Sequence, residues 1–199
     1  MPVAIDFEAA VRRKSRESQS TLELFFSENG PRIVACAAAM ARAFSEGGRL
    51  FAMGNGGSAC DARHAAVEFM HPIVEKRPAF PAVALGSDTA LLSAVANDSD
   101  FALAFSSELK LLARRGDVAL GISTSGKSAG VLRALQAAKE LGLLAVGLTG
   151  PDGGRFPDIC DHCFVVPSFS IHRIQEVHAT FLHVLWDLVH MTRGEEDVL

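Results

Sequence analysis

The 199-residue sequence predicts an α/β fold, a three-layer sandwich in which helices flank a parallel sheet of about five strands. Two observations carry this prediction. Short apolar runs alternate along the chain with longer segments whose apolar residues recur at helical spacing. Strands that alternate with helices form βαβ units, whose parallel strands are covered on both faces. We find no linker or low-complexity segment and expect a single domain over residues 1–199.

Residues 1–47 are expected to form a leading pair of helices, ahead of an α/β core at residues 48–199. Apolar residues recur at helical spacing over residues 6–28, and a Gly-Pro step at residues 30–31 stops the pattern. A second helix, rich in alanine, is expected over residues 31–46. Such an apolar pair could cover the sheet or a partner subunit.

In the α/β core, predicted strands alternate with predicted helices. The predicted strands lie, in chain order, at residues 49–53, 80–85, 117–122, 143–148 and 163–166. One predicted helix follows the first strand directly, and the others cover residues 89–96, 100–113, 128–141 and 171–191. Ligands of such sheets bind beyond the carboxyl ends of the strands, so the loops at that edge are the first place to look for functional residues.

The composition excludes several classes of protein. Hydrophobic residues make up 49% and charged residues 21% of the chain, which argues against a disordered protein. The net charge of −4 gives no bulk attraction to nucleic acid or to anionic membranes. No apolar run approaches the ~20 residues of a membrane span, and the N-terminus lacks the pattern of a signal peptide. Four cysteines in a chain of this length do not suggest a disulfide scaffold, so we expect the cytoplasm.

A glycine-rich turn at residues 54–58 separates the strand at residues 49–53 from the helix that follows. Its glycines let a ligand approach the backbone, and the helix N-terminus favours an anion such as phosphate. The turn is neither a dinucleotide fingerprint, because Ala59 stands at the last glycine position, nor a P-loop. A plain tight turn remains the alternative. In the helix, His64 and Glu68 are four residues apart, so they share one face and can act on one molecule or ion.

A second candidate loop covers residues 123–128 and also lies between a strand and a helix. It offers the hydroxyls of three serines and one threonine, together with loop N–H groups, at a helix N-terminus. The alternative is a capping loop with Ser128 as an ordinary N-cap. Capping needs one hydroxyl and not four, so a phosphate site is favoured. Lys127 either adds charge to this site or points to solvent.

These two motifs combine with three further segments that occur in the same order in one known family. The further segments are residues 96–98, 148–154 and 173–178. On these five segments the chain resembles the sugar isomerase (SIS) family, and within that family the phosphoheptose isomerases. The resemblance covers nearly the whole chain and implies the SIS fold.

The resemblance also implies an activity and an assembly. The activity is aldose–ketose isomerisation of a sugar phosphate, that of sedoheptulose 7-phosphate to D-glycero-D-manno-heptose 7-phosphate through an enediol, with metal assistance. The assembly is a homotetramer with active sites at subunit contacts and one zinc ion per subunit. The implied zinc ligands are His64, Glu68, Gln175 and His183, of which Glu68 and His183 would move the protons. The implied substrate contacts are Asn55, Gly56, Gly57, Ser58, Glu68, Asn97, Asp98, Ser123, Thr124, Ser125, Ser128 and Gln175.

The residues themselves give this zinc site mixed support. His64 and Glu68 are a good ligand pair, and nitrogen and oxygen ligands suit zinc. Gln175 and His183 are eight residues apart, which is ~12 Å along a helix axis. One ion can contact both only if it lies between them and both side chains reach inward. A glutamine is also a weak ligand, which favours a labile metal.

Three departures from the family concern the surroundings of the reacting sugar. The family continues after the catalytic glutamate with a Gly-Arg-aromatic turn, whereas this chain has a stiff His71-Pro72 step. Val67 stands where an acidic residue is common, and His172 where Ala or Asp is common. These changes keep open an isomerase for a different sugar phosphate. The other alternative is a non-catalytic SIS regulator that binds a phosphosugar or bridges proteins, similar to the factor that binds the bacterial replication initiator.

Other residues that could bind a metal or take part in a reaction are given structural roles. The Cys160–Cys163 pair has metal-like spacing, but the chain has no second pair, so a zinc knuckle is not expected. His178 has either a supporting role behind the site or a place in the core or an interface. His190 and the acidic residues after it look like a solvated end of the chain.

Overall fold

The computed structural model describes residues 6–73 and 76–197. Its five strands are β1 (Leu50–Gly54), β2 (Ala82–Ala84), β3 (Val118–Ser123), β4 (Leu144–Thr149) and β5 (His162–Val165). They form one sheet in the order β2-β1-β3-β4-β5, and every neighbouring pair is parallel. The predicted parallel sheet is therefore confirmed. Continuous apolar runs such as residues 50–54 are buried along their whole length, as expected for strands covered on both faces.

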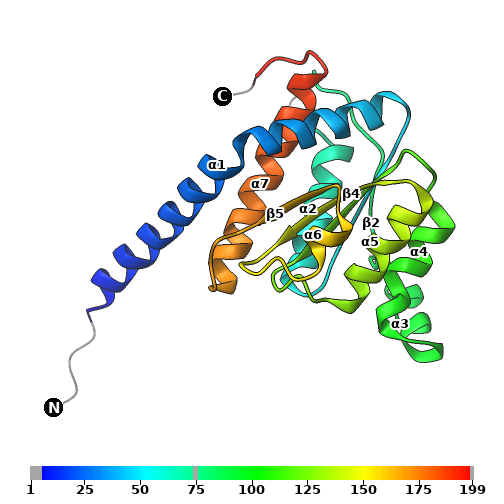
Figure 1. The fold of residues 1–199 in the computed structure, drawn as a ribbon, viewed down its shortest axis with the longest axis horizontal. Coiled ribbons are helices and arrows are strands. Elements are labelled where there is room, and N and C mark those ends of the chain that lie inside the picture. The colour runs from blue at the N-terminus through cyan, green and yellow to red at the C-terminus, as the bar shows by residue number, and fades with distance from the viewer. Residues whose placement is uncertain (1–5, 74–75, 198–199) are drawn as a thin grey trace.

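Helices lie on both faces of this sheet (Figure 1). They are α1 (Phe7–Ser45), α2 (Gly57–Met70), α3 (Thr89–Asp98), α4 (Ala104–Leu112), α5 (Ala129–Leu141), α6 (Phe156–Ile159) and α7 (Ile171–Thr192). The helix predicted over residues 100–113 is divided, because a 3-10 turn, η1 (Phe101–Leu103), precedes α4. The short helix α6 was not predicted.

The alternation of side chains along the strands creates two cores. Leu50 and Ala52 of β1 pack with α1, α2 and α7 on one face of the sheet. Phe51 and Met53 point to the opposite face and pack with α4, α5 and α6. The predicted three-layer sandwich is confirmed by this division.

Residues 7–45 form one continuous helix, so the predicted leading pair of helices is wrong. Proline in a helix interior removes one hydrogen bond and crowds the preceding turn, which is why the sequence predicted a break. Pro31 lies on the exposed side of α1, where water can satisfy the carbonyl that the proline leaves free. The opposite side, from Phe25 to Phe44, is buried against α7 and the sheet. This packing outweighs the local signal.

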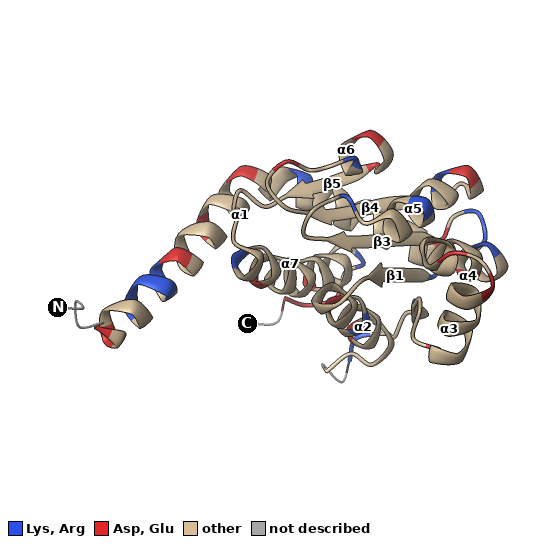
Figure 2. Cartoon of the chain, turned by 90° about the horizontal axis from the view of Figure 1, so that it is seen from below, with Lys and Arg blue, Asp and Glu red and all other residues tan. Residues whose placement is uncertain are grey.

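The N-terminal part of α1 projects away from the sheet (Figure 1). Its apolar side chains Phe7 and Val11 are 74% and 69% exposed. Charged residues of both signs gather on the same part of the helix (Figure 2). Although α1 has 39 residues, none of the helices within the described residues combines the length and apolar character needed to cross a bilayer.

Two histidines of α7 are buried. His178 is 1% exposed, and its Nε2 lies 3.4 Å from the carbonyl oxygen of Thr149, at the end of β4. Burial lowers the pKa of His178 to about 4, so the ring is neutral at pH 7. His190 is also fully buried, against the rings of Phe80 and Trp186, so its assignment to a solvated end is wrong. The sequence pattern missed this contact because Phe80 lies far away along the chain.

Stability should fall as the pH drops from about 6.5 to about 4. Unfolded His178 binds a proton near pH 6.5, whereas folded His178 does so only near a pKa of about 4, so the unfolded state binds more protons in this window. The gap corresponds to about 3 kcal/mol, present above pH 6.5 and lost as the pH falls towards 4. Urea unfolding of the wild type and of His178→Gln from pH 4 to pH 8 measures it. The wild type should lose more stability than the variant, and equal losses would contradict the assignment.

Candidate active site

The glycine-rich turn joins β1 to α2 at the point where the strand order reverses. β1 pairs with β2 on one side and with β3 on the other, and such switch points are where open α/β sheets bind ligands. Gly56, the N-cap of α2, has a φ of 58°, a left-handed conformation that favours glycine. A Cβ on Gly57 would overlap the Nε2 atom of Gln175, so only glycine lets this amide approach the turn. The predicted turn residues Asn55, Gly56 and Gly57 are exposed, whereas Ser58 is buried.

The serine loop, residues 123–128, lies beside this turn, at the carboxyl end of β3. Ser128 is the N-cap of α5, but its side chain caps no helical N–H. Its Oγ instead accepts a hydrogen bond of 2.8 Å from Nδ2 of Asn55, which ties the two loops together. Two helix N-termini therefore meet at one edge of the sheet, an arrangement that favours a bound anion. The plain capping loop that the sequence left open does not fit this geometry.

Hydroxyl groups and a salt bridge arrange the rest of the serine loop. The Oγ atoms of Ser123 and Ser125 are 3.5 Å apart, and the N–H of Lys127 donates to Ser125 Oγ at 3.2 Å. Lys127 Nζ lies 2.6 Å from Oδ2 of Asp152, so its charge is already paired. This ammonium, hydrogen-bonded to Asp152, lowers the pKa of that carboxyl. The loop thus offers its hydroxyls and backbone N–H groups as donors, together with the N–H groups of Lys127 that Asp152 does not use.

Three predicted residues converge at one point between α2 and α7. The Nε2 atom of His64 lies 3.1 Å from Oε1 of Glu68 and 3.2 Å from Nε2 of His183. All three ligand atoms lie within 4.8 Å of one another, the one such group among the described residues. His64 and Glu68 come from one face of α2, and the close approach of α7 brings His183 to them.

Two of the three separations within this cluster fit zinc. Ligand atoms held at about 2.1 Å from one tetrahedral zinc lie about 3.4 Å from each other. The two short separations, 3.1 and 3.2 Å, are close to this value. Two imidazoles and a carboxylate are suitable zinc ligands, and three protein ligands leave a fourth position open for a substrate. One turn before His64, burial raises the pKa of the Asp61 carboxyl, an effect that His64 opposes.

The fourth predicted ligand lies elsewhere on α7. The amide of Gln175 is placed against Gly57, at the N-terminal end of α2. His183 is eight residues further along α7, a rise of about 12 Å. Gln175 is therefore positioned to contact a ligand at the glycine-rich turn, and its zinc contact stays a prediction.

Asn97 and Asp98 end α3, where both are exposed and bonded to each other through Nδ2 and Oδ1 at 2.7 Å. In the described residues, no hydrogen bond joins them to the turn or to the serine loop. A pocket beside the turn is lined by Asn55 and Gly56 and, from the other side, by Leu92 of α3. The helix that carries Asn97 and Asp98 thus borders the predicted site, and their substrate contacts stay predictions.

Comparison with known proteins identifies the family of this chain. The sequence model of the SIS domain matches residues 15–150. This chain belongs to the SIS domain family. The phosphoheptose isomerase of Thermodesulfovibrio yellowstonii is 40% identical to it over 195 residues, 98% of this chain and 94% of that protein.

Solved structures of SIS proteins agree with the fold. The phosphoheptose isomerase from Neisseria gonorrhoeae has a TM-score of 0.86 at 35% identity, over 92% of this chain and 98% of that one. The phosphoheptose isomerase from Francisella tularensis has a TM-score of 0.89 at 29% identity, over 94% of this chain and all (100%) of that one. The resemblance stated from the motifs is confirmed.

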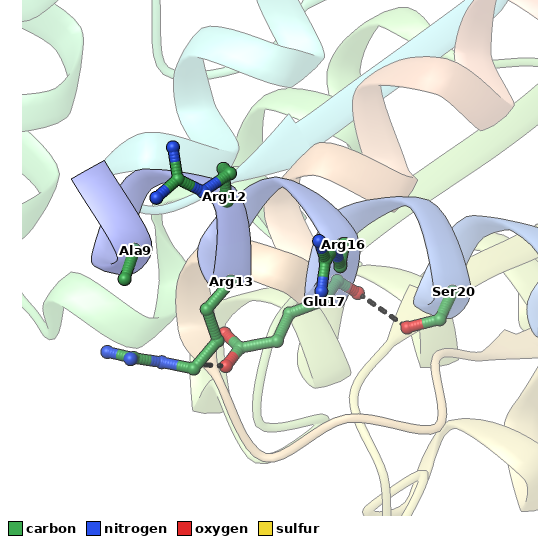
Figure 3. A pocket seen from close by; sticks show the side chains of 6 residues that line it. All are labelled: Ala9, Arg12, Arg13, Arg16, Glu17 and Ser20. Atoms are coloured by element: carbon green, nitrogen blue, oxygen red, sulfur yellow. Dashed lines mark hydrogen bonds and ion pairs between the residues drawn. The ribbon is translucent and has the colours of Figure 1, made fainter.

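Two other features do not form part of this SIS site. Cys160 and Cys163 are free, and no metal-binding group of the described residues includes them. A surface hollow on the projecting part of α1 is lined by six side chains of that one helix (Figure 3). Its polar groups mostly serve the helix itself, since Arg13 pairs with Glu17 and Ser20 bonds the Glu17 carbonyl. We assign no function to either feature.

One contact at the SIS site was not predicted. The indole N–H of Trp186, one turn beyond His183 on α7, donates to the backbone carbonyl of Glu68 at 2.9 Å. The sequence contains a signal for it. The helical donor for the Glu68 carbonyl would be residue 72, which is a proline and has no N–H.

Zinc binding should depend on the histidines of the cluster. His64→Ala and His183→Ala each remove one of three ligands, so zinc affinity should fall at least 100-fold. His71→Ala is the control, because His71 is exposed and lies outside the cluster. Competition with a chromophoric chelator measures the affinity of each purified protein. Zinc binding as tight in His64→Ala as in the wild type would exclude this site.

Proposed function

We propose that this SIS protein is an aldose–ketose isomerase that converts sedoheptulose 7-phosphate to D-glycero-D-manno-heptose 7-phosphate. The convergence of His64, Glu68 and His183 carries this proposal. A carboxylate and an imidazole next to a metal-binding position are what an enediol mechanism needs. The phosphoheptose isomerase relatives support the choice of a heptose phosphate.

The distance between the two parts of the site supports a substrate with a remote phosphate. From Gly57 to His64, α2 rises through seven residues, or about 10 Å. Phosphate held by the turn and the serine loop would therefore lie at the far end of the sugar from the reacting carbons. Binding energy at that end would position the carbon atom that is deprotonated.

The isomerisation needs proton transfer at carbon and proton transfer at oxygen, and the cluster offers one side chain for each. Isomerisation of a 2-ketose removes a proton from C1, forms an enediol and returns a proton to C2. The Glu68 carboxylate is the base for these carbon atoms, and the His183 imidazole exchanges a proton between O1 and O2. Zinc held by His64, Glu68 and His183, with Gln175 as a weaker and labile contact, would supply a Lewis acid that polarises the carbonyl.

We further propose that the enzyme is a homotetramer and works in the cytoplasm. The exposed Phe7 and Val11 of α1 and the absence of buried residues in the described α3 leave apolar surface for partner subunits. Asn97 and Asp98, at the end of α3, would reach substrate in such an assembly. The four free cysteines fit a reducing compartment.

An isomerase for another sugar phosphate is the second candidate, and one observation favours it. Exposed His71 and half-buried Pro72 directly follow the last turn of α2, where the family has a basic residue. A missing basic side chain would change the contacts to the sugar hydroxyls. A regulator without catalysis is less favoured, because the relatives that cover nearly the whole chain are phosphoheptose isomerases.

Turnover should require Glu68 and a metal. Purified protein incubated with sedoheptulose 7-phosphate should form the aldose, stop after treatment with a chelator and recover when zinc is added. Glu68→Gln removes the base, so kcat should fall by about 10³-fold. Anion-exchange chromatography of the sugar phosphates measures product. No product under any metal condition would exclude the heptose assignment, and a panel of sugar phosphates would then test the second candidate.

The serine loop should control binding rather than the chemical step. Ser125→Ala and Ser128→Ala each remove a hydroxyl from the proposed phosphate site, so KM should rise by about tenfold with little change in kcat. Ser27→Ala is the matched control, since the Ser27 hydroxyl bonds its own helix at the Leu24 carbonyl. Steady-state kinetics of the wild type, the two loop variants and the control gives kcat and KM for each. An unchanged KM in both loop variants would show that the phosphate binds elsewhere.

A further inference from the structure

The last turn of α2 contains a carbonyl group that its own helix cannot satisfy. In an α-helix the carbonyl of residue i accepts from the N–H of residue i+4. For Glu68 that residue is Pro72, which has no N–H. The neighbouring carbonyl, that of Val67, is satisfied by His71 at 2.8 Å. Because α2 ends at Met70 and His71 is not helical, the Glu68 carbonyl is one of the helix-end carbonyls that need a donor from outside the helix.

Trp186 supplies the missing donor from α7. Its indole Nε1 donates to the Glu68 carbonyl at 2.9 Å, and its side chain is almost fully buried, with the residue 5% exposed. Trp186 is three residues after His183, so both lie on the same side of α7. One hydrogen bond thus links the backbone of Glu68 to the helix that carries its partner in the cluster.

The indole ring is itself held in place by Arg77. The Arg77 guanidinium carbon lies 4.6 Å from the centre of the Trp186 ring, within the range of a cation–π contact. Its Nη1 donates to Asp187 at 2.7 Å, and its Nη2 donates to the carbonyl of Glu196 at 2.8 Å. Arg77 is 6% exposed, so these contacts fix a buried charge. Such support restricts the orientation of the indole N–H.

We propose that Trp186 is a positioning residue that replaces the donor lost at Pro72 and thereby sets the Glu68 side chain relative to His183. Pro72 and Trp186 form a compensating pair, although 114 positions separate them in the numbering. For turnover this inference rests on the proposed function. For metal binding it rests only on the cluster geometry, because a tilted last turn of α2 would move the Glu68 carboxylate away from His64 and His183.

The test combines two substitutions. Trp186→Phe keeps an aromatic ring for Arg77 but removes the N–H. Pro72→Ala supplies a backbone N–H and also frees His71, which precedes it, to become helical, so that α2 can extend and this N–H can donate to the Glu68 carbonyl. Trp186→Phe alone should weaken zinc binding about tenfold and lower kcat by about tenfold or more, with KM within about twofold. The double variant should recover most of both losses, a coupling that independent sites do not show.

Controls separate this role from a loss of packing. Phe181→Leu changes a buried aromatic residue of α7 that packs on Phe25 and Phe164, so it should lower the melting temperature and leave zinc affinity unchanged. If Trp186→Phe does not fold, Arg77→Lys removes the planar contact and keeps the indole, and it should weaken zinc binding about threefold. Chelator competition and thermal unfolding are measured for each protein.

The results that would overturn the proposal differ from the result that would overturn the proposed function. Wild-type zinc affinity in Trp186→Phe, or in Arg77→Lys where only that variant folds, overturns the proposal. A loss that Pro72→Ala does not restore also overturns it, because the lost donor would not be the cause. If the wild type isomerises no sugar phosphate, the proposed function fails, whereas the zinc measurements still decide the role of Trp186.

Discussion

The close packing of α2 against α7 is the constraint on which the site depends. Apart from Phe69, the buried residues of α2 are small, namely Ser58, Ala62, Ala65 and Ala66. Small side chains let neighbouring elements approach α2 closely, and Nε2 of His183 on α7 lies 3.2 Å from Nε2 of His64. The same pairing of α2 with α7 places the amide of Gln175 against Gly57, at the N-terminal end of α2.

The two parts of the site use different physical means. The phosphate part is built from backbone and hydroxyl donors at the edge of a buried sheet, where the strands fix the loops. The metal part is built from side chains on two helices, whose relative position depends on packing and on contacts such as that of Trp186. We expect the phosphate part to tolerate changes in helix packing better than the metal part does.

The sequence predicted features that depend on local pattern. The strands were visible because residues such as 50–53 are apolar without interruption, and the pairing of His64 with Glu68 follows from helical spacing alone. The two loops were visible because glycines and hydroxyls concentrate directly after strands. The convergence of His183 on this pair was implied by family resemblance, since no local pattern links α2 with α7.

Errors arose where distant contacts override local signals. Pro31 predicted a break in α1, but packing on α7 keeps the helix continuous. His190 looked solvated beside acidic residues, yet Phe80 and Trp186 enclose it. Pro72 was recognised as a departure from the family, but its partner Trp186 could be found only from the folded chain.

The central claim is that one bound sugar phosphate joins the serine loop to the metal cluster. A crystal structure of the zinc-loaded Glu68→Gln variant with sedoheptulose 7-phosphate, with anomalous data at the zinc edge, tests this most directly. We expect one zinc peak beside His64 and His183, phosphate oxygens within hydrogen-bonding distance of Ser123–Ser128 hydroxyls, and C1 and C2 beside residue 68. Sugar bound in the reverse direction, or phosphate away from the serine loop in every subunit, would contradict the account.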